Sequence, residues 1–129
     1  MPLKLEHLDH LSLTVTDVDA TCEFYENILG MEVVTFGDGR RALVIGSQKI
    51  NLHRAGHTPQ VSMQKPQPGS GHLCFITQQP IASVVDHLTK NGVKIELGPV
   101  SRTGARAELE SAYSRDPDGN ILEVANELI

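Results

Sequence analysis

The sequence lacks three features that would assign it to broad classes of protein. Its 11 Lys and Arg residues stand against 16 Asp and Glu, a formal net charge of −5, so no basic excess is available to neutralise nucleic-acid phosphates. It contains no apolar run long enough to span a bilayer. Its first residues lack the apolar core and small-residue cleavage site of a secretory signal. Nucleic acids and membranes are therefore excluded as partners, and we expect a cytoplasmic protein.

Cysteine is also scarce, with only two residues of this type. Cys22 falls in a helical pattern and Cys74 in a strand pattern, which favours reduced, partly buried thiols over a disulfide framework. Cys74 is predicted to be a small buried residue rather than a ligand. The rest of the composition is ordinary: 129 residues, 40% hydrophobic and 21% charged, suit one globular domain with a normal core.

What the sequence does contain is a repeated plan. A strand pattern opens at His10 and the helix pattern after it ends at Gly30; a second strand pattern opens at His72, and its helix pattern ends at Gly92. The offset is the same at both ends, since 72 − 10 and 92 − 30 both equal 62. A fixed offset that joins a strand-entry His to a helix-ending Gly indicates one supersecondary unit used twice.

Each unit is predicted to run strand, helix, then three strands, which gives an α+β fold of two βαβββ modules. Within the single domain 1–129, module one occupies about 5–54, a proline-rich linker about 55–70 and module two about 71–129. The elements predicted in module two are strands at 72–77, 93–97, 111–115 and 120–125, a helix at about 80–91, and a long loop over 98–104.

Four polar residues occupy related positions under this repeat: His10, Asn51, His72 and Glu123. Asn51 becomes the counterpart of Glu123 when the segment 50–52 is matched to 122–124. Taken singly, a strand His is more often a hydrogen-bonded structural residue, and a strand Glu can simply face solvent. Their coincidence under the repeat favours a site for a divalent cation, in which two imidazoles and a carboxylate leave positions open for water or substrate.

Other residues near these positions have more than one interpretation each. His53, two residues after Asn51, is a further ligand, a base or a structural residue. Tyr113 is a proton donor beside the site or a core tyrosine with a satisfied hydroxyl. Arg102 and Arg106, on the predicted loop, form a lid that clamps an anionic substrate or are solvated charges. The same pair of readings applies to the cations that flank the strand of Asn51, namely Lys49 and Arg54.

These segments resemble the vicinal oxygen chelate superfamily, which includes glyoxalase I, fosfomycin-resistance proteins and extradiol dioxygenases. The resemblance is carried by 10–15, 24–32 and 116–124. Asn51-Leu52-His53 and the segment 98–105 are most similar to the glyoxalase domain-containing protein 5 group. The resemblance implies curved mixed sheets that wrap a metal. It also implies a homodimer, in which His10 of one chain meets His72 and Glu123 of the other.

The implied activity is that of a metal-dependent lyase or isomerase of glyoxalase type, acting by bidentate chelation on a small oxygenated metabolite or a thiol adduct. The alternatives are an Fe(II) ring-cleaving or other oxygenase, and a non-catalytic small-molecule binding or resistance protein. Asn51 stands where glyoxalase I has a glutamate ligand, and Glu110 where fosfomycin-resistance proteins carry an arginine, which argues against both reactions. The roles implied are metal ligation (Ni, Zn, Mn or Fe) by His10, His72 and Glu123, catalysis by His53 and Tyr113, and substrate binding by Asn51, Arg102 and Arg106.

Overall fold

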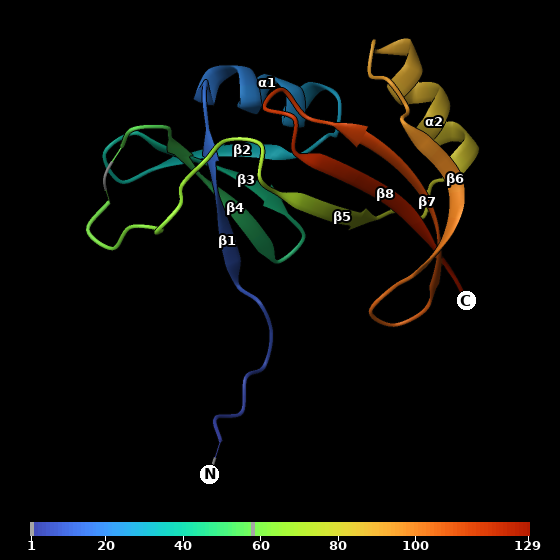
Figure 1. The fold of residues 1–129 in the computed structure, drawn as a ribbon, viewed down its shortest axis with the longest axis horizontal. Coiled ribbons are helices and arrows are strands. Elements are labelled where there is room, and N and C mark those ends of the chain that lie inside the picture. The colour runs from blue at the N-terminus through green and yellow to red at the C-terminus, as the bar shows by residue number, and fades with distance from the viewer. Residues whose placement is uncertain (1, 58) are drawn as a thin grey trace. The chain divides into compact units, whose positions relative to one another are not determined.

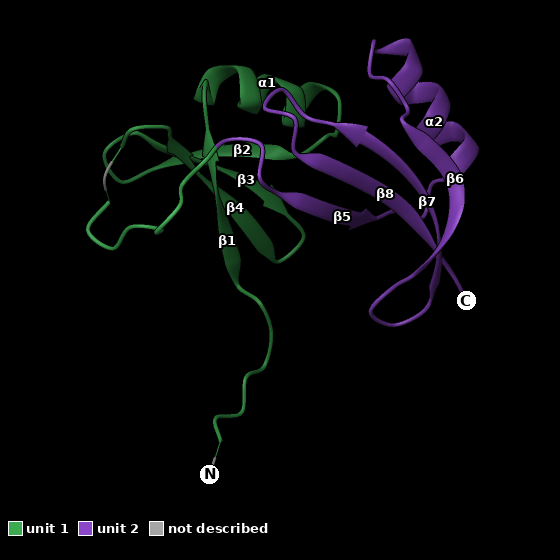
Figure 2. Cartoon of the chain, in the orientation of Figure 1, with its two compact units in different colours: residues 1–67 green, residues 68–129 purple. Residues whose placement is uncertain are grey.

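The computed structural model describes residues 2–57 and 59–129, and the chain forms two compact units, 1–67 and 68–129 (Figure 2). Each unit contains one helix and one four-stranded sheet in the order βαβββ (Figure 1), as the repeat predicts. The elements are β1 (His10–Val15), α1 (Val18–Asn27), β2 (Glu32–Phe36), β3 (Arg40–Ile45), β4 (Gln48–Arg54), β5 (His72–Ile76), α2 (Ile81–Lys90), β6 (Leu97–Thr103), β7 (Glu108–Arg115) and β8 (Ile121–Leu128).

Both sheets are mixed and have the same strand order. The first runs β1-β4-β3-β2 and the second β5-β8-β7-β6; β1 is parallel to β4 and β5 to β8, while the other pairs are antiparallel. The registers of the two parallel pairs also agree. Ser12 pairs with Asn51, and Cys74 pairs with Glu123. Ser12 and Cys74 each lie two residues after the histidine that opens their strand. Asn51 and Glu123 therefore occupy equivalent backbone positions in the two sheets.

The first helix begins and ends where its sequence requires. The Asp17 side chain accepts a hydrogen bond of 3.0 Å from the Ala20 N–H, which satisfies one of the free donors at the helix start. Gly30 adopts a φ of +73°, the left-handed conformation that glycine adopts without steric cost. The buried Cys22 and Tyr25 face the sheet, where α1 contacts β2, β3 and β4. One face of the first sheet is thus covered by α1.

The second helix uses packing rather than a side-chain cap. Pro80 precedes α2 and makes no capping hydrogen bond. Ile81, Val84 and Leu88 are buried, at the spacing of one helix face, and α2 contacts β7 and β8. Neither helix in the described residues is long and apolar enough to cross a membrane.

The prediction for 93–104 was wrong. The strand starts at Leu97 rather than at position 93, and the expected loop over 98–104 is mostly β6. Gly98 and Pro99 are untypical of a strand, but β6 lies at the edge of its sheet, where a missing N–H is tolerated. The pairing with β7 shifts between Leu97 and Val100, and Gly98 has a φ of +114°. A β-carbon at Gly98 would collide with the Ser111 carbonyl oxygen, so only glycine fits there.

The turn between β7 and β8 is held by its own side chains and ties down the start of β5. The Asp116 carboxylate accepts from the backbone N–H groups of Asp118 and Asn120 at 3.0 and 2.9 Å, and from the Asn120 amide at 2.8 Å. The Asn120 Oδ1 accepts from the Gly71 N–H at 2.7 Å, and the Ile121 N–H donates to the Gly71 carbonyl at 2.9 Å. The residue before the strand of His72 is therefore fixed to the residues before the strand of Glu123.

Candidate functional site

Two of the three predicted metal ligands lie together in the second unit. The His72 Nε2 and the Glu123 Oε1 are 3.0 Å apart. Because His72 pairs with Ile121 across the parallel strands, Glu123 is its diagonal neighbour on the same face of the sheet. The Glu123 residue is 6% exposed, whereas the His72 side chain is 50% exposed. The pair consists of a buried carboxylate and an accessible imidazole.

The second oxygen of Glu123 is held by a residue that the sequence analysis did not single out. The Ser111 hydroxyl, on β7, donates to the Glu123 Oε2 at 2.7 Å and is fully buried. Burial raises the pKa of Glu123, but hydrogen bonds from Ser111, His72 and Tyr113 outweigh it and leave the pKa below its usual value. The carboxylate is therefore ionised at neutral pH, which is the form that ligates a metal.

Tyr113 and Arg102 extend this network. Tyr113 pairs with Glu123 across β7 and β8, and its ring centroid is 6.0 Å from that of His72. The Arg102 Nε donates to the Tyr113 hydroxyl at 2.9 Å, and the guanidinium lies 5.4 Å from the ring centroid. Arg102 is a residue of β6 rather than of a loop, so it does not form the predicted lid. It acts instead on the tyrosine beside the carboxylate.

Arg106, the other arginine expected on the lid, lies in the connection between β6 and β7. Its Nε and Nη2 donate to the two carboxylate oxygens of Glu127, at 3.0 and 2.9 Å. The two Arg106 nitrogens that would bind an anionic substrate in the predicted clamp are therefore already bound to Glu127.

Cys74 is also located differently from the prediction, since it is exposed rather than buried. It is the register partner of Glu123 and lies two residues after His72 on the same strand face. Desolvation, together with the Glu123 carboxylate, raises the pKa of this thiol to about 11. At neutral pH the sulfur is therefore a thiol and a poor nucleophile.

His10, the third predicted ligand, belongs to the first unit. Its Nδ1 lies 2.8 Å from the Asp9 Oδ2. A carboxylate on one ring nitrogen fixes the orientation of an imidazole and leaves the other nitrogen available, as in many metal sites. Within 2–57 and 59–129, no group of three or more His, Cys, Asp or Glu side chains is close enough to hold a metal ion.

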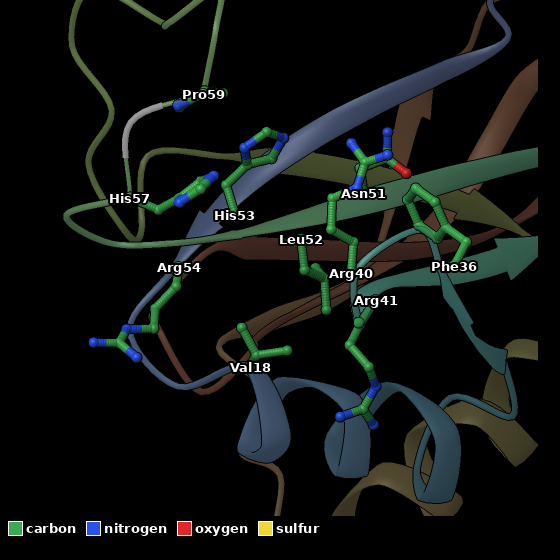
Figure 3. A pocket seen from close by; sticks show the side chains of 11 residues that line it. Val18, Phe36, Arg40, Arg41, Asn51, Leu52, His53, Arg54, His57 and Pro59 are labelled. Atoms are coloured by element: carbon green, nitrogen blue, oxygen red, sulfur yellow. The ribbon is translucent and has the colours of Figure 1, made fainter.

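Asn51 and His53 line a cavity of about 220 Å³ in the first unit (Figure 3). Phe36 and Arg40, at the end of the β2–β3 hairpin, lie at the Asn51 end, and His57 lies beside His53. The rings of His53 and His57 have centroids 6.4 Å apart. His57, which falls in the linker predicted over 55–70, is therefore part of the cavity wall.

Comparison with known proteins assigns the family. The profile of the Glyoxalase/Bleomycin resistance protein/Dioxygenase superfamily matches residues 7–124. The chain belongs to this superfamily. It is 48% identical to Virulence protein STM3117 of Salmonella typhimurium over 94% of this chain and 84% of that protein. The structure of integron cassette protein VCH_CASS1 of V. cholerae superposes with a TM-score of 0.94 at 48% identity, covering 98% of each chain.

Relatives of this chain in the superfamily include metal-dependent enzymes. Metallothiol transferase FosB of Shouchella clausii is 24% identical over 91% of this chain and 77% of that protein. Superfamily membership and the paired βαβββ fold are thus shown, as the sequence resemblance predicted.

Sequence reasoning missed the contributions of Ser111, Phe36 and Arg40. For Ser111 a signal existed, because it alternates with Tyr113 on one strand face. The roles of Phe36 and Arg40 depend on side-chain reach across a hairpin, for which no motif exists.

Proposed function

We propose that this chain is a divalent-metal-dependent enzyme of the glyoxalase superfamily in which His10, His72 and Glu123 share one ion. The proposed reaction is that of a lyase or isomerase acting on a small oxygenated metabolite or a thiol adduct. As the family resemblance implies, His10 comes from a second copy of the chain, so the active form is a homodimer. The observation that carries the proposal is the 3.0 Å approach of His72 and Glu123 in a network that keeps the carboxylate ionised.

The residues present fit a metal in two respects. The His72 Nε2 and the Glu123 Oε1 are 3.0 Å apart, which is close enough for both atoms to contact one ion at ligand distances of about 2.0–2.2 Å. The donor set of imidazole and carboxylate suits several first-row ions, including Ni, Zn, Mn and Fe. Ser111 on the carboxylate and Asp9 on His10 supply the outer hydrogen bonds that orient metal ligands.

When bound, the metal would polarise a carbonyl or stabilise an oxyanion of a chelated substrate. The protein's own contribution centres on Tyr113. Because the Arg102 Nε donates to the Tyr113 oxygen, the phenol proton points elsewhere, toward Glu123 in the free protein. A substrate oxygen that takes the place of the Glu123 carboxylate oxygen would receive this hydrogen bond, so Tyr113 is assigned as donor or general acid.

On the first unit, His53 is assigned as the base and Asn51 as a substrate-binding amide. His53 is half-buried in the wall of the cavity, two residues after Asn51 on β4. Its imidazole ring supplies a nitrogen that can accept a proton from a bound substrate. Arg102 acts on Tyr113, while Arg106 must leave Glu127 before it contacts a substrate.

Metal analysis tests the proposal directly. Elemental analysis of protein purified without added metal or chelator should find one divalent ion per chain. Titration of the metal-free protein with Ni(II), Zn(II), Mn(II) and Fe(II) should show one site, which is lost in His10→Ala and Glu123→Gln. His87→Ala, at an exposed position on α2, is the matched control and should bind as the wild type does. Full occupancy in either site variant would refute the ligand assignment.

Activity assays then separate the reaction classes. Metal-dependent conversion of a hemithioacetal or an oxygenated metabolite without oxygen uptake supports the lyase or isomerase. Ferrous-dependent oxygen uptake with a catechol would instead identify a ring-cleaving oxygenase. A chain that stays metal-free in excess of all four ions would be a non-catalytic binding protein.

A further inference from the structure

We propose that the cavity of the first unit binds a small carboxylate that also carries a hydroxyl or N–H donor. This inference deepens the proposed function, on which it rests, because Asn51 and His53 belong to the substrate side of that proposal. It is argued from residues of the first unit alone. Its test uses metal-free protein, so its outcome does not depend on the metal site.

The size of the cavity limits the ligand. The main hollow holds about 220 Å³, and a second of about 200 Å³ shares His53, Arg54, His57 and Pro59 with it. At about 30 Å³ per water molecule, the main hollow has room for about seven waters. This volume lies below the range of about 300–1,000 Å³ that drug-sized ligands occupy. The ligand is therefore a molecule of few heavy atoms.

Two polar atoms of these walls lack a hydrogen-bond partner among the described residues. They are the Asn51 Oδ1, in the main hollow, and the Thr14 Oγ1, in the second; both atoms are buried, and the Thr14 residue is only 8% exposed. Thr14 pairs with His53 across β1 and β4, so both residues lie on the face that carries Asn51. A buried amide oxygen without a donor is costly, and a ligand hydroxyl or N–H would satisfy it.

Positive charge collects on the same face. The Arg40 guanidinium carbon lies 4.7 Å, and the Lys49 Nζ 4.1 Å, from the centroid of the Phe36 ring. Within the described part of the chain neither cation takes part in an ion pair, although the whole chain is acidic. Lys49 helps to lower the pKa of Asp9, but that carboxylate is hydrogen-bonded to His10.

Among the arginines around the cavity, Arg40 is the one that lies at the Asn51 end of the main hollow (Figure 3). Arg41 donates to Asp19 at 2.9 Å and points toward α1, and Arg54 lines both hollows at the end of His53 and His57 (Figure 3). Gly37 leaves space for the Arg40 side chain, because a β-carbon there would lie 3.1 Å from the Arg40 Nη2. A planar guanidinium binds a carboxylate through two parallel hydrogen bonds, which selects this anion.

Together these features favour a hydroxycarboxylate. The carboxylate pairs with Arg40 in the field of Lys49, and the ligand donor bonds the Asn51 Oδ1. The His53 and His57 rings at the far end supply further polar contacts. A ligand lacking either the charge or the donor leaves one of these protein groups unmatched and binds more weakly.

The test is a titration of metal-free protein, kept in chelator, with glycolate, acetate and glycolamide, followed by amide chemical shifts in NMR spectra. Glycolate should bind saturably with shifts confined to residues around the cavity. Acetate, which lacks the hydroxyl, and glycolamide, which lacks the charge, should each bind roughly tenfold more weakly. Arg40→Gln and Asn51→Leu should each reduce glycolate affinity about tenfold, whereas Arg115→Gln, the same charge loss on the second unit, should not change it.

The outcomes are distinguishable. Equal binding of the three probes, or no saturable binding of glycolate, overturns the inference with the wild-type protein alone. Glycolate affinity unchanged in both Arg40→Gln and Asn51→Leu overturns the location, and tighter binding of inorganic phosphate overturns the choice of a carboxylate. Failure of the metal titration with successful glycolate binding would refute the proposed metal site and leave this cavity as a ligand site.

Discussion

Replacement of Asn120 by Ala should loosen the junction that holds the start of β5 against the β7–β8 turn. Asn120 is 1% exposed, and its amide accepts from the Gly71 N–H at 2.7 Å and donates to the Asp116 Oδ2 at 2.8 Å. Truncation removes both bonds without removing the backbone bonds of the turn. Because Gly71 directly precedes His72, the perturbation reaches the strand that carries a proposed metal ligand.

The magnitude follows from the groups left without partners. An unsatisfied backbone N–H in a part-buried setting costs about 1–3 kcal/mol, and a hydrogen bond to a charged group contributes about 1.5–3 kcal/mol. Effects of bonds made by one side chain are not additive, so we expect the free energy of unfolding to fall by about 3 kcal/mol in Asn120→Ala. For a domain of this size, that corresponds to a decrease of about 10 °C in Tm.

Urea unfolding measures this change. Far-UV circular dichroism is the suitable probe because the sequence contains no tryptophan, and the m-value should stay constant while the midpoint falls. Asn27→Ala, at an exposed position in the last turn of α1, is the matched control and should change stability by less than about 0.5 kcal/mol. An Asn120→Ala variant as stable as this control would show that the junction is not held by the amide.

Three further predictions concern the core, a surface ion pair and a thiol. Leu88→Ala, at a position 1% exposed on α2, should lower the free energy of unfolding by about 2–5 kcal/mol in urea. The Arg106 guanidinium lowers the pKa of Glu127 below 4.5, so the pair stabilises the fold above pH 4.5. This stabilisation is lost as the pH falls through the lowered pKa of the folded state. The difference in unfolding free energy between wild type and Arg106→Gln, measured by urea unfolding at successive pH values, should therefore shrink as the pH falls. Partial desolvation and the Glu123 carboxylate raise the pKa of the exposed Cys74 thiol to about 11. This thiol should therefore react with a disulfide reagent at pH 8 more slowly than free cysteine does, and Glu123→Gln should accelerate the reaction.

Much of the fold could be predicted because its local signals agree with one another. The glycines predicted to end the two helix patterns, at positions 30 and 92, lie just after α1 and α2. The strand β6 could not be predicted, because Gly98 and Pro99 are loop residues by composition. Its position at the sheet edge and the close approach of the Ser111 carbonyl make these residues acceptable there, and both are tertiary facts.

The candidate site was predictable to the extent that it follows the repeat. His72 and Glu123 were selected because they occupy related strand positions, and parallel pairing of β5 with β8 brings them to 3.0 Å. The hydrogen bond from Ser111 depends on the register of β7 against β8, which alternation alone does not specify. The lid prediction for Arg102 was wrong for the same reason as the β6 prediction, since both assumed that glycine and proline indicate a loop.

The common register of the two parallel strand pairs has a consequence for how the chain can change. Asn51 and Glu123 occupy equivalent register positions in two sheets of the same strand order. An amide and a carboxylate could therefore be exchanged between these positions with little change in the main chain. The internal repeat therefore supplies a second position, equivalent to that of Glu123, at which a carboxylate could be carried with the same strand register.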